Sequence, residues 1–216
     1  MKQTVLIIDA GHGGLDPITG KYATPEKIGK KTLHTNGQLY HGGGWFYEGV
    51  SNRKFATDFI RQASTEFVCC PVFHPWHDTP LNNRVAMANT IFEKMQAHCV
   101  FLSFHSNAFG SNFAPQTAAH GVTLHTLFKN GGAADIANVI APGLNERFGD
   151  YGSRRPDNWP LKFELDIHIT RHTKMPAIVL EVGFFDNPKD ADILMNPFAI
   201  MEFNKTLLEE LKNELI

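Results

Sequence analysis

Short apolar runs alternate with polar segments along this chain, and three of the runs lead into a side chain that can bind or serve a metal ion. The runs cover residues 5–8, 100–104 and 177–180. The side chains that follow them are His12, His105 and Glu181. Short apolar runs of this kind are typical of buried strands. In an open α/β sheet, ligands collect beyond the carboxyl ends of the strands, so we expect these three side chains to converge.

The same pattern predicts a chain in which strands and helices alternate. Strands are expected at residues 4–9, 67–73, 99–104, 120–128, 167–170 and 177–180. Apolar residues at helical spacing predict helices at 49–64, 81–96, 131–148, 186–194 and 198–215. Several of the strands are apolar throughout, which favours a sheet that is covered on both faces. We therefore predict an α/β fold with a mostly parallel central sheet of about six strands and helices on both faces.

Two long segments lack a sustained period and are predicted to be loops. The first, residues 15–45, is rich in Gly, Lys, Thr and His. We interpret it as a long segment that passes over the opening of the site, and a hairpin is one form that it can take. The second, residues 151–163, is polar and contains Arg154, Arg155 and Trp159. Long loops without regular structure are usually functional or disordered.

The composition is that of one globular domain. The chain has 216 residues, of which 43% are hydrophobic, and this is enough for a full core. A formal net charge of −2 and a pI near 6.6 give no broad electrostatic case for binding nucleic acid or anionic lipid. We therefore expect no nucleic-acid partner, and a substrate that is neutral or of mixed charge.

The cysteines and the first residues bear on the compartment. Cys69, Cys70 and Cys99 cannot form a complete disulfide framework and contain no CxxC metal knuckle, so we expect them to be buried in strands. The first apolar run is too short for a secretion signal, and no stretch approaches the ~18–20 apolar residues of a membrane span. We expect synthesis in the cytoplasm without a recognisable signal peptide, and no membrane insertion.

The polar residues at the strand ends suit a catalytic zinc ion, which needs three protein ligands and one open position. Among the 11 histidines, His12 and His105 are the two that lie directly at predicted strand ends. The carboxylates that could complete the set are Asp9, Asp16, Glu26, Glu48 and Glu181. Spacing alone does not choose among them.

Four segments, in this order, carry a family resemblance. Residues 9–17 have the sequence Asp-Ala-Gly-His-Gly-Gly-Leu-Asp-Pro, and Glu48 opens a predicted helix. Residues 103–108 have the sequence Ser-Phe-His-Ser-Asn-Ala, and residues 175–187 have the sequence Met-Pro-Ala-Ile-Val-Leu-Glu-Val-Gly-Phe-Phe-Asp-Asn. Together they closely resemble the zinc-dependent N-acetylmuramoyl-L-alanine amidases of the cell-separation, spore and phage-lysin type. The match is collinear over residues 5–195, whereas the GHGG motif alone would be a weak signal.

The resemblance implies a set of roles and a substrate. His12, Glu48 and His105 match the family's ligands for one zinc ion. Glu181 matches the carboxylate that activates the attacking water, a role that agrees with metal-assisted amide hydrolysis. The implied substrate is peptidoglycan, cut between the lactyl group of N-acetylmuramic acid and L-alanine. The implied fold is an α/β domain with a mostly parallel sheet, in agreement with the hydrophobic pattern.

The segment between the first two implied ligands resembles an insertion. We expect residues 1–216 to form a single zinc amidase catalytic domain with this insertion at about 15–47. Glu48 lies 36 positions after the first histidine ligand, farther than is usual in the family, so Glu26 is a rival. We prefer Glu48 because it leads directly into the predicted amphipathic helix, as the family's ligand does. Glu26 stands in polar, lysine-rich surroundings that are typical of a solvated loop charge.

Other side chains are weaker candidates for contact with the substrate. Asn107 could hydrogen-bond the substrate, orient the metal ligands or stabilise a turn. Arg171 follows the predicted strand at 167–170, so its guanidinium could reach a substrate carboxylate, although we favour an exposed loop charge. Trp159 and the aromatic residues at 45–47 could line a groove for sugar or peptide, or fill the core.

Three further polar residues could support the site. Asp9 could brace His12, or it could form hydrogen bonds within its own turn. Arg84 and Asn89 also match a stretch of the family. We favour a structural or solvated role for them over direct contact with the substrate.

Rival functions are open at this point. A zinc peptidase or deacetylase would use the same chemistry on another amide, and a non-catalytic peptidoglycan-binding or regulatory domain would keep the fold without turnover. All three implied zinc ligands and the implied catalytic residue Glu181 are present, which favours an active enzyme that acts at the cell wall. Because no signal peptide or separate wall-binding module is recognised, we favour a phage or prophage endolysin that a membrane-permeabilising partner releases to the wall. A secreted bacterial enzyme is the alternative.

Overall fold

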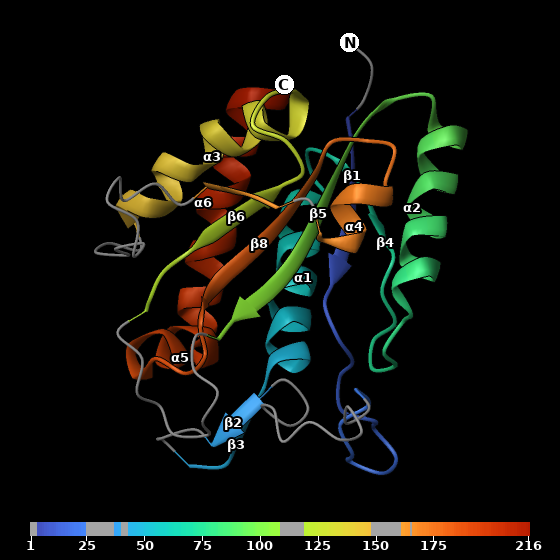
Figure 1. Cartoon of the computed structure of the whole chain (residues 1–216). Coiled ribbons are helices and arrows are strands. Elements are labelled where there is room, and N and C mark those ends of the chain that lie inside the picture. Colours follow the sequence, from blue (N-terminus) through green and yellow to red (C-terminus); the bar gives the residue numbers. More distant parts are fainter. Residues whose placement is uncertain (1–3, 25–36, 40–42, 109–118, 148–160, 165) are drawn as a thin grey trace.

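A central sheet organises the computed structural model, which describes residues 4–24, 37–39, 43–108, 119–147, 161–164 and 166–216. Within these residues the sheet has six strands in the order β4-β1-β5-β8-β6-β7 (Figure 1). In that order the strands are Val68–Pro71, Thr4–Ala10, His98–Asn107, Ala177–Phe184, Thr123–Thr126 and Leu161–Phe163. β4, β1, β5 and β8 are parallel, whereas β6 and β7 run the opposite way. The predicted α/β fold with a mostly parallel sheet is confirmed.

The central strands are continuously apolar because both faces of the sheet are covered. All seven residues of β1 are buried. Leu6 and Ile8 pack into one hydrophobic cluster, and Val5 and Ile7 pack into a second cluster on the opposite face. This two-sided burial is why an apolar run, rather than an alternating pattern, predicts these strands.

Helices cover the two faces unequally (Figure 1). The first cluster is covered by three long helices, which are α1 (Glu48–Ala63), α3 (Gly132–Arg147) and α6 (Pro197–Leu215). The second cluster is covered by α2 (Leu81–Met95) and the short α4 (His168–His172). α5 (Pro188–Met195) connects β8 to α6. None of the helices in the described part of the chain is both long and apolar enough to cross a lipid bilayer.

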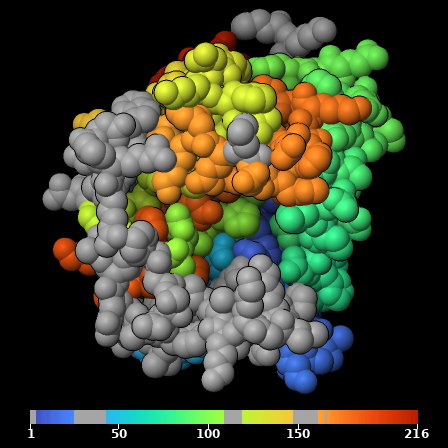
Figure 2. Space-filling model, in the orientation of Figure 1, coloured from blue at the N-terminus to red at the C-terminus, as the bar shows by residue number. Residues whose placement is uncertain are grey.

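The face that carries α4 becomes polar toward the carboxyl ends of the parallel strands. On β5, Ser103 and His105 continue the side that begins with the buried Phe101. On β8, Glu181 continues the side of Val179 in the same way. Figure 2 shows this face hollowed beneath the orange segment that contains α4, with blue, cyan and green atoms visible in the hollow. α2 and the short α4 thus leave this part of the face uncovered.

Two segments differ from the prediction. Residues 167–170, predicted as a strand, lead into and form the start of α4. β5 and β6 already pair with both edges of β8, so this segment has no edge of β8 to join, and Ile169 packs into the second cluster instead. β7 occupies residues 161–163, which were predicted as the end of a loop. A strand of three residues is too short to show a period in the sequence.

A second, two-stranded sheet lies in the long segment after β1. β2 (Gly37–Leu39) pairs antiparallel with β3 (Trp45–Tyr47), which is the hairpin considered for this segment. β3 leads directly into α1, so the hairpin is tied to the start of that helix. Residues 25–36 and 40–42, and with them the rival ligand Glu26, lie outside the described residues.

Candidate metal centre

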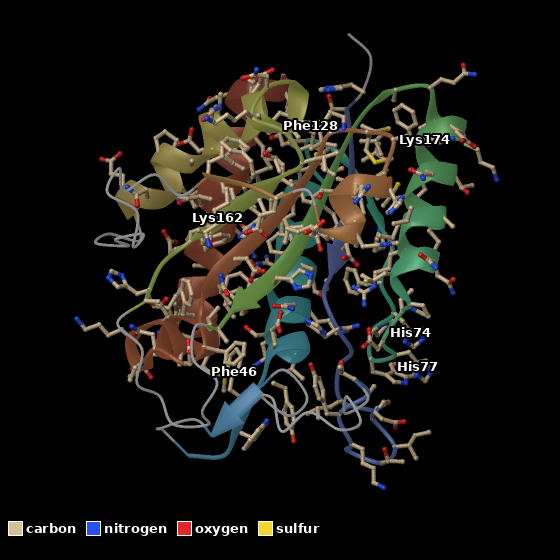
Figure 3. All side chains as sticks on the ribbon, viewed as in Figure 1. Phe46, His74, His77, Phe128, Lys162 and Lys174 are labelled. Atoms are coloured by element: carbon tan, nitrogen blue, oxygen red, sulfur yellow. The ribbon has the colours of Figure 1, made fainter. Side chains whose placement is uncertain are left out.

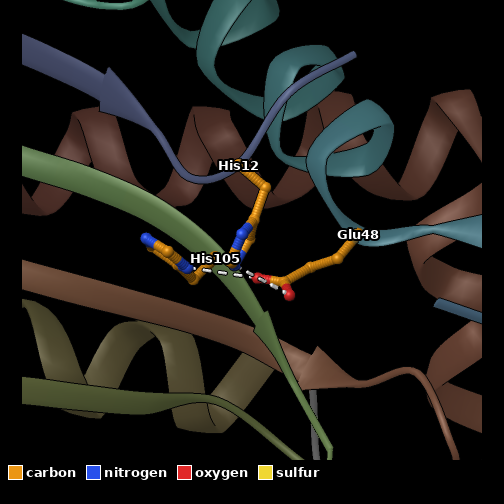
Figure 4. A group of neighbouring side chains, drawn as sticks. All are labelled: His12, Glu48 and His105. Atoms are coloured by element: carbon orange, nitrogen blue, oxygen red, sulfur yellow. Dashed lines mark hydrogen bonds and ion pairs between the residues drawn. The ribbon is translucent and has the colours of Figure 1, made fainter. Parts of the chain in front are cut away.

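Three potential metal ligands meet at the carboxyl edge of the sheet (Figure 4). His12 follows β1, His105 lies near the end of β5, and Glu48 is the first residue of α1. Nε2 of His12 lies 3.2 Å from Oε2 of Glu48, and Nδ1 of His105 lies 3.1 Å from Oε1 of Glu48. The potential ligating atoms all lie within 4.8 Å of one another. Two imidazoles and one carboxylate at this spacing fit a single catalytic zinc ion.

The backbone fits closely around this centre at two glycines. A Cβ atom on Gly11 would collide with the ring of His105, and a Cβ atom on Gly49 would collide with the backbone oxygen of Gly13. Glycine therefore allows the end of β1 and the start of α1 to approach the centre. His12 has a φ of 59°, in the left-handed region that residues with a side chain rarely adopt. Its surroundings must hold it in that conformation.

Two buried arginines hold the backbone around His12. Arg53 donates from Nη2 to the backbone oxygen of His12 at 2.7 Å, and from Nη1 to that of Gly11 at 3.3 Å. Arg84 donates from Nη2 to the same oxygen of His12 at 3.1 Å, and from Nη1 to that of Ala10 at 2.6 Å. These bonds fix successive carbonyl groups of the loop, and so they stabilise the left-handed conformation of His12.

Two carboxylates balance the charge of Arg84, which is only 1% exposed. Its Nη1 lies 2.9 Å from Oδ1 of Asp9, and its Nη2 lies 2.9 Å from Oδ1 of Asp78. The other oxygen of Asp9 accepts a hydrogen bond of 2.6 Å from the hydroxyl of Ser103. Asp9 therefore supports the loop of His12 through Arg84. Arg84 has the structural role that we favoured for it.

The carboxylate of Glu48 is fixed by neighbours that sequence reasoning missed. Nδ2 of Asn52, one turn further along α1, donates to Oε1 of Glu48 at 3.2 Å, and the backbone nitrogen of Ser106 donates to the same oxygen at 3.3 Å. The hydroxyl of Ser106 in turn donates to Oδ1 of Asn52 at 3.2 Å. The spacing of four residues between Glu48 and Asn52 was the signal that could have revealed this pair.

The charges of the three potential ligands depend on one another. Burial by itself would raise the pKa of the Glu48 carboxyl, but the charge of His12 and hydrogen bonds with both imidazoles hold that pKa well below its usual range. Burial opposes protonation of His105, but its hydrogen bond with Glu48 and the negative charge there raise the pKa of His105 to about 9. A carboxylate between two imidazoles suits a divalent cation, which takes the place of the imidazole protons on binding.

Glu181 stands beside this centre on the neighbouring strand. Its Cα pairs with that of His105 across β5 and β8. Its Oε2 is buried and has no hydrogen-bond partner among the described residues. Burial raises the pKa of Glu181 to about 7, against the opposing charge of His105 and with the support of Glu48. A carboxyl group with a pKa near neutrality can both accept and return a proton.

Comparison with known protein families agrees with this geometry. A family model described as N-acetylmuramoyl-L-alanine amidase (Amidase_3) matches residues 6–213. The chain belongs to this amidase family. That membership supports amidase activity on the peptidoglycan of the cell wall.

Solved structures of two amidases and of an endolysin share the fold of this chain. CwlD from Clostridioides difficile, solved in complex with the GerS lipoprotein, has a TM-score of 0.71 at 18% identity, covering 100% of this chain and 98% of CwlD. The catalytic domain of CwlV from Bacillus (Paenibacillus) polymyxa var. colistinus has a TM-score of 0.68 at 23% identity, covering 100% and 98%. The catalytic domain of the CD27L endolysin, which targets Clostridia difficile, has a TM-score of 0.60 at 12% identity, covering 99% and 98%. No curated protein sequence matches significantly.

Two of the weaker candidates in this amidase have structural partners. Oδ1 of Asn107 accepts a hydrogen bond of 2.8 Å from the backbone nitrogen of Ala108, as expected for a turn-stabilising side chain. Asn89 joins α2 to the segment around α4. Its Nδ2 donates to the backbone oxygen of His172 at 3.0 Å, and its Oδ1 accepts from the backbone nitrogen of Lys174 at 2.9 Å. Contact of Asn107 with the substrate stays a prediction.

The aromatic residues before α1 contribute to packing. Phe46 is 1% exposed, and its ring stacks on that of Phe185 with the centroids 5.3 Å apart. Tyr47 is half-buried beside Tyr22, with the centroids 4.6 Å apart. Phe46 therefore fills the core and does not line a groove. Trp159 lies outside the described residues.

Arg171 is exposed on α4. The predicted place of Arg171 at the rim of the sheet was based on a strand at 167–170, and that strand prediction was wrong because the segment leads into α4. α4 packs against α2 and β8. Contact between Arg171 and the substrate stays a prediction that no longer has the support of a strand end. Arg154 and Arg155 lie outside the described residues.

Proposed function

We propose that this amidase is a zinc-dependent peptidoglycan hydrolase that cuts the amide bond between the lactyl group of N-acetylmuramic acid and L-alanine. The observation that carries the proposal is the meeting of three potential ligands within 4.8 Å, next to Glu181, whose Oε2 is buried. A carboxyl group with a near-neutral pKa beside a metal site is typical of hydrolytic catalysis. A domain that only bound the wall would not need this combination.

Zinc is the ion that best suits the donor set of two imidazole nitrogens and a carboxylate. His12, Glu48 and His105 would hold it. When bound, zinc polarises the scissile carbonyl group and lowers the pKa of the attacking water to about 7. Arg84 keeps the loop of His12 in place, and Asn52 orients the carboxylate of Glu48. These supporting contacts preorganise the ligands before the metal ion arrives.

Glu181 would carry the protons of the reaction. Its carboxylate takes one proton from water while the water oxygen attacks the carbonyl carbon of the lactyl group. The bond between that carbon and the alanine nitrogen then breaks, and Glu181 returns the proton to the nitrogen. The products are a lactyl carboxylate on the glycan and a stem peptide with a free L-alanine amino terminus. A pKa of about 7 suits both halves of this cycle.

We further propose that residues 1–216 form a single catalytic domain with an insertion at about 15–47. The protein would act at the cell wall. A phage or prophage endolysin is the origin we favour, and an endolysin domain is among the proteins of similar fold. A gene for a membrane-permeabilising protein next to the gene for this chain is the observation that tests this origin.

Digestion of purified peptidoglycan, with and without a zinc chelator, tests the proposed reaction. Mass spectrometry would score new alanine amino termini against new reducing sugar ends. We expect chelator-sensitive release of intact stem peptides that begin with L-alanine. Cleavage within the stem peptide would indicate a zinc peptidase, and release of acetate would indicate a deacetylase. Binding without cleavage by the metal-loaded protein, across several wall types, would indicate a non-catalytic domain.

A further inference from the structure

Beside Glu181, the face of the sheet that carries α4 continues onto two more strands. Thr123 on β6 is the Cα partner of Glu181, and His125 on the same strand is the partner of Lys162 on β7. Leu124 and Leu161 pack into the cluster behind the sheet. Side chains alternate between the faces of a strand, so the other three residues project toward the face that carries Glu181. Figure 3 labels Lys162 on this part of the sheet.

Two of these side chains are buried, and each has a polar atom without a hydrogen-bond partner among the described residues. Thr123 is 4% exposed and His125 is 5% exposed. The hydroxyl of Thr123 and Nε2 of His125 have no hydrogen-bond partner among the described residues, and the same is true of Oε2 of Glu181. Buried polar atoms in folded proteins almost always find a partner. Three such atoms on one face, next to the proposed reaction centre, indicate that a polar ligand completes them.

The charges of the cluster favour an anionic ligand. Burial lowers the pKa of His125 to about 4, helped by the charge of Lys162 and opposed by that of Glu164, so this imidazole is neutral at pH 7. Oε2 of Glu164 lies 3.1 Å from Nδ1 of His125, and the Glu164 side chain is 46% exposed. The Lys162 ammonium makes no ion pair with any described residue. The Glu164 carboxylate is held at Nδ1 of His125, so the Lys162 ammonium, the hydroxyl of Thr123 and Nε2 of His125 are the groups that can bind a carboxylate of a ligand.

We propose that Thr123, His125 and Lys162 form the subsite for the stem peptide, and that the Lys162 ammonium binds the free carboxylate of the second stem residue. This inference rests on the proposed amidase function. The amide-linked glycan carries no charge, whereas the stem peptide carries carboxylates. The second stem residue is a glutamate linked through its side-chain carboxyl, which leaves its α-carboxylate free or amidated. The peptide, and not the glycan, therefore binds on the side of the site that carries Lys162.

The spacing of the strands indicates that the Lys162 ammonium reaches the second residue of the stem peptide. β7 lies two strands away from β8, about 10 Å, and Lys162 is in register with Val179, about 7 Å along β8 from Glu181, so the Cα atoms of Lys162 and Glu181 lie about 12 Å apart. An extended dipeptide spans about 7 Å, and the flexible stem of a lysine side chain covers the remainder. The peptide would thus run from Glu181 across β6 toward β7, along the hydroxyl of Thr123 and Nε2 of His125. The glycan would leave on the other side of the metal centre.

Calorimetric titration of the full chain with two dipeptides tests this subsite. The dipeptides are L-alanine joined to D-glutamate through its side-chain carboxyl, with the α-carboxyl either free or amidated. We expect the wild-type protein to bind the free acid about tenfold more tightly at low salt, as for a charge-assisted hydrogen bond. Lys162→Met should bring this ratio to about one, whereas the control Lys205→Met, an exposed lysine on α6, should keep it.

Thr123→Val keeps the side-chain shape and should weaken both dipeptides by a similar factor, without changing the ratio. A wild-type ratio near one, an unchanged ratio in Lys162→Met, or full affinity in Thr123→Val would overturn the subsite. The peptidoglycan digest separates the two proposals. Release of stem peptides with no discrimination between the dipeptides rejects the subsite alone. Discrimination lost in Lys162→Met, without any cleavage of peptidoglycan, supports the subsite and rejects the amidase reaction.

Discussion

The proposed proton transfer depends on Glu181. A buried carboxylate oxygen without a partner costs folding free energy, so its retention suggests a task other than stability. Its strand is held between β5 and β6, which fixes the carboxylate beside His105 and Thr123. The potential metal ligands lie on other elements. Proton transfer and metal binding can therefore be separated by substitution.

Glu181→Gln should keep the zinc content of the protein while lowering kcat/KM for stem-peptide release by roughly 10²- to 10⁴-fold. The amide of glutamine keeps the shape of the side chain but cannot accept the proton of the attacking water. Zinc content is measured on the purified variant, and activity on soluble muramoyl peptides. His12→Ala should lose both zinc and activity. Glu93→Gln, at an exposed ion pair on α2, should change neither. Wild-type rates in Glu181→Gln would rule out Glu181 as the base.

The pH dependence of the reaction should carry the signature of the same residue. Burial raises the pKa of Glu181 to about 7, and the base is active only when deprotonated. Activity should therefore be present above this pKa and fall as the pH drops through it. A bound cation would lower the pKa of Glu181 from this value, so the midpoint of the acid limb should lie at or below about 7. A kcat/KM profile for the zinc-loaded protein gives this midpoint. An acid limb centred well above that value, or one that persists unchanged in Glu181→Gln, would contradict the assignment.

Some individual residues of the site could be predicted from the sequence and others could not, for physical reasons. His12, His105 and Glu181 were predictable because each follows a run that is buried on both faces. Glu48 came only from the family resemblance, since it follows an irregular segment. Asn52 and Ser106 were missed because their partner is another polar side chain, which hydrophobic periodicity does not reveal.

The stem-peptide subsite was missed for a related reason. Thr123 and His125 alternate with buried apolar residues in a strand of four residues, and Lys162 lies in a strand of three. Alternation in such short strands does not show which face is covered by a helix and which borders a site. That distinction depends on the place of β6 and β7 beside β8 in the sheet.

At the scale of elements, Arg84 connects α2 to the end of β1. Its guanidinium is buried and contacts Asp9, Asp78 and the loop of His12. The face of the sheet under α2 is otherwise closed by apolar contacts. This ion-pair network therefore ties the covering helix to the metal site, and it should matter for both stability and metal binding.

Arg84→Met should lower the free energy of unfolding by about 3–5 kcal/mol, because it leaves the carboxylate of Asp9 buried without its cation. Urea unfolding of the metal-free protein measures this change. The matched control is Arg61→Met, which removes an exposed ion pair with Asp58 and should cost at most about 1 kcal/mol. The zinc affinity of Arg84→Met should also fall, since the loop loses two hydrogen bonds from the Arg84 guanidinium, one at the backbone oxygen of His12 and one at that of Ala10. Equal stability of the two variants would refute a supporting role for Arg84.

The elements themselves were predictable to different degrees. β1, β5 and β8 lie in the middle of the sheet, so their burial on both faces produced unambiguous apolar runs. The segment at 167–170 alternates apolar and polar residues as a strand does, yet both edges of β8 are occupied. Its final conformation depends on a pairing between distant parts of the chain, which local sequence does not encode.

At the scale of the whole molecule, unequal covering of the sheet creates the site. Three long helices close one face (Figure 1), whereas the other face is covered by α2 and the short α4 and is hollowed beneath α4 (Figure 2). The ligands and the proposed base lie at the carboxyl edge of the sheet, and the proposed stem-peptide subsite continues across β6 and β7, with His125 and Lys162 set back to the level of Val179. The order of the strands thus determines the order in which the metal centre, the proposed base and the peptide subsite follow one another across the sheet. The metal centre lies at one end of this row and the peptide subsite lies at the other.

The central claim is that one zinc ion, held at this edge, turns the fold into an amidase. Titration of the metal-free protein with zinc, while the release of stem peptides from a muramoyl peptide is followed, tests it most directly. We expect no release without metal and a linear rise that ends at one zinc ion per chain, with no rise in His12→Ala. Full activity of the metal-free protein, or one bound zinc ion per chain without any release, would contradict it.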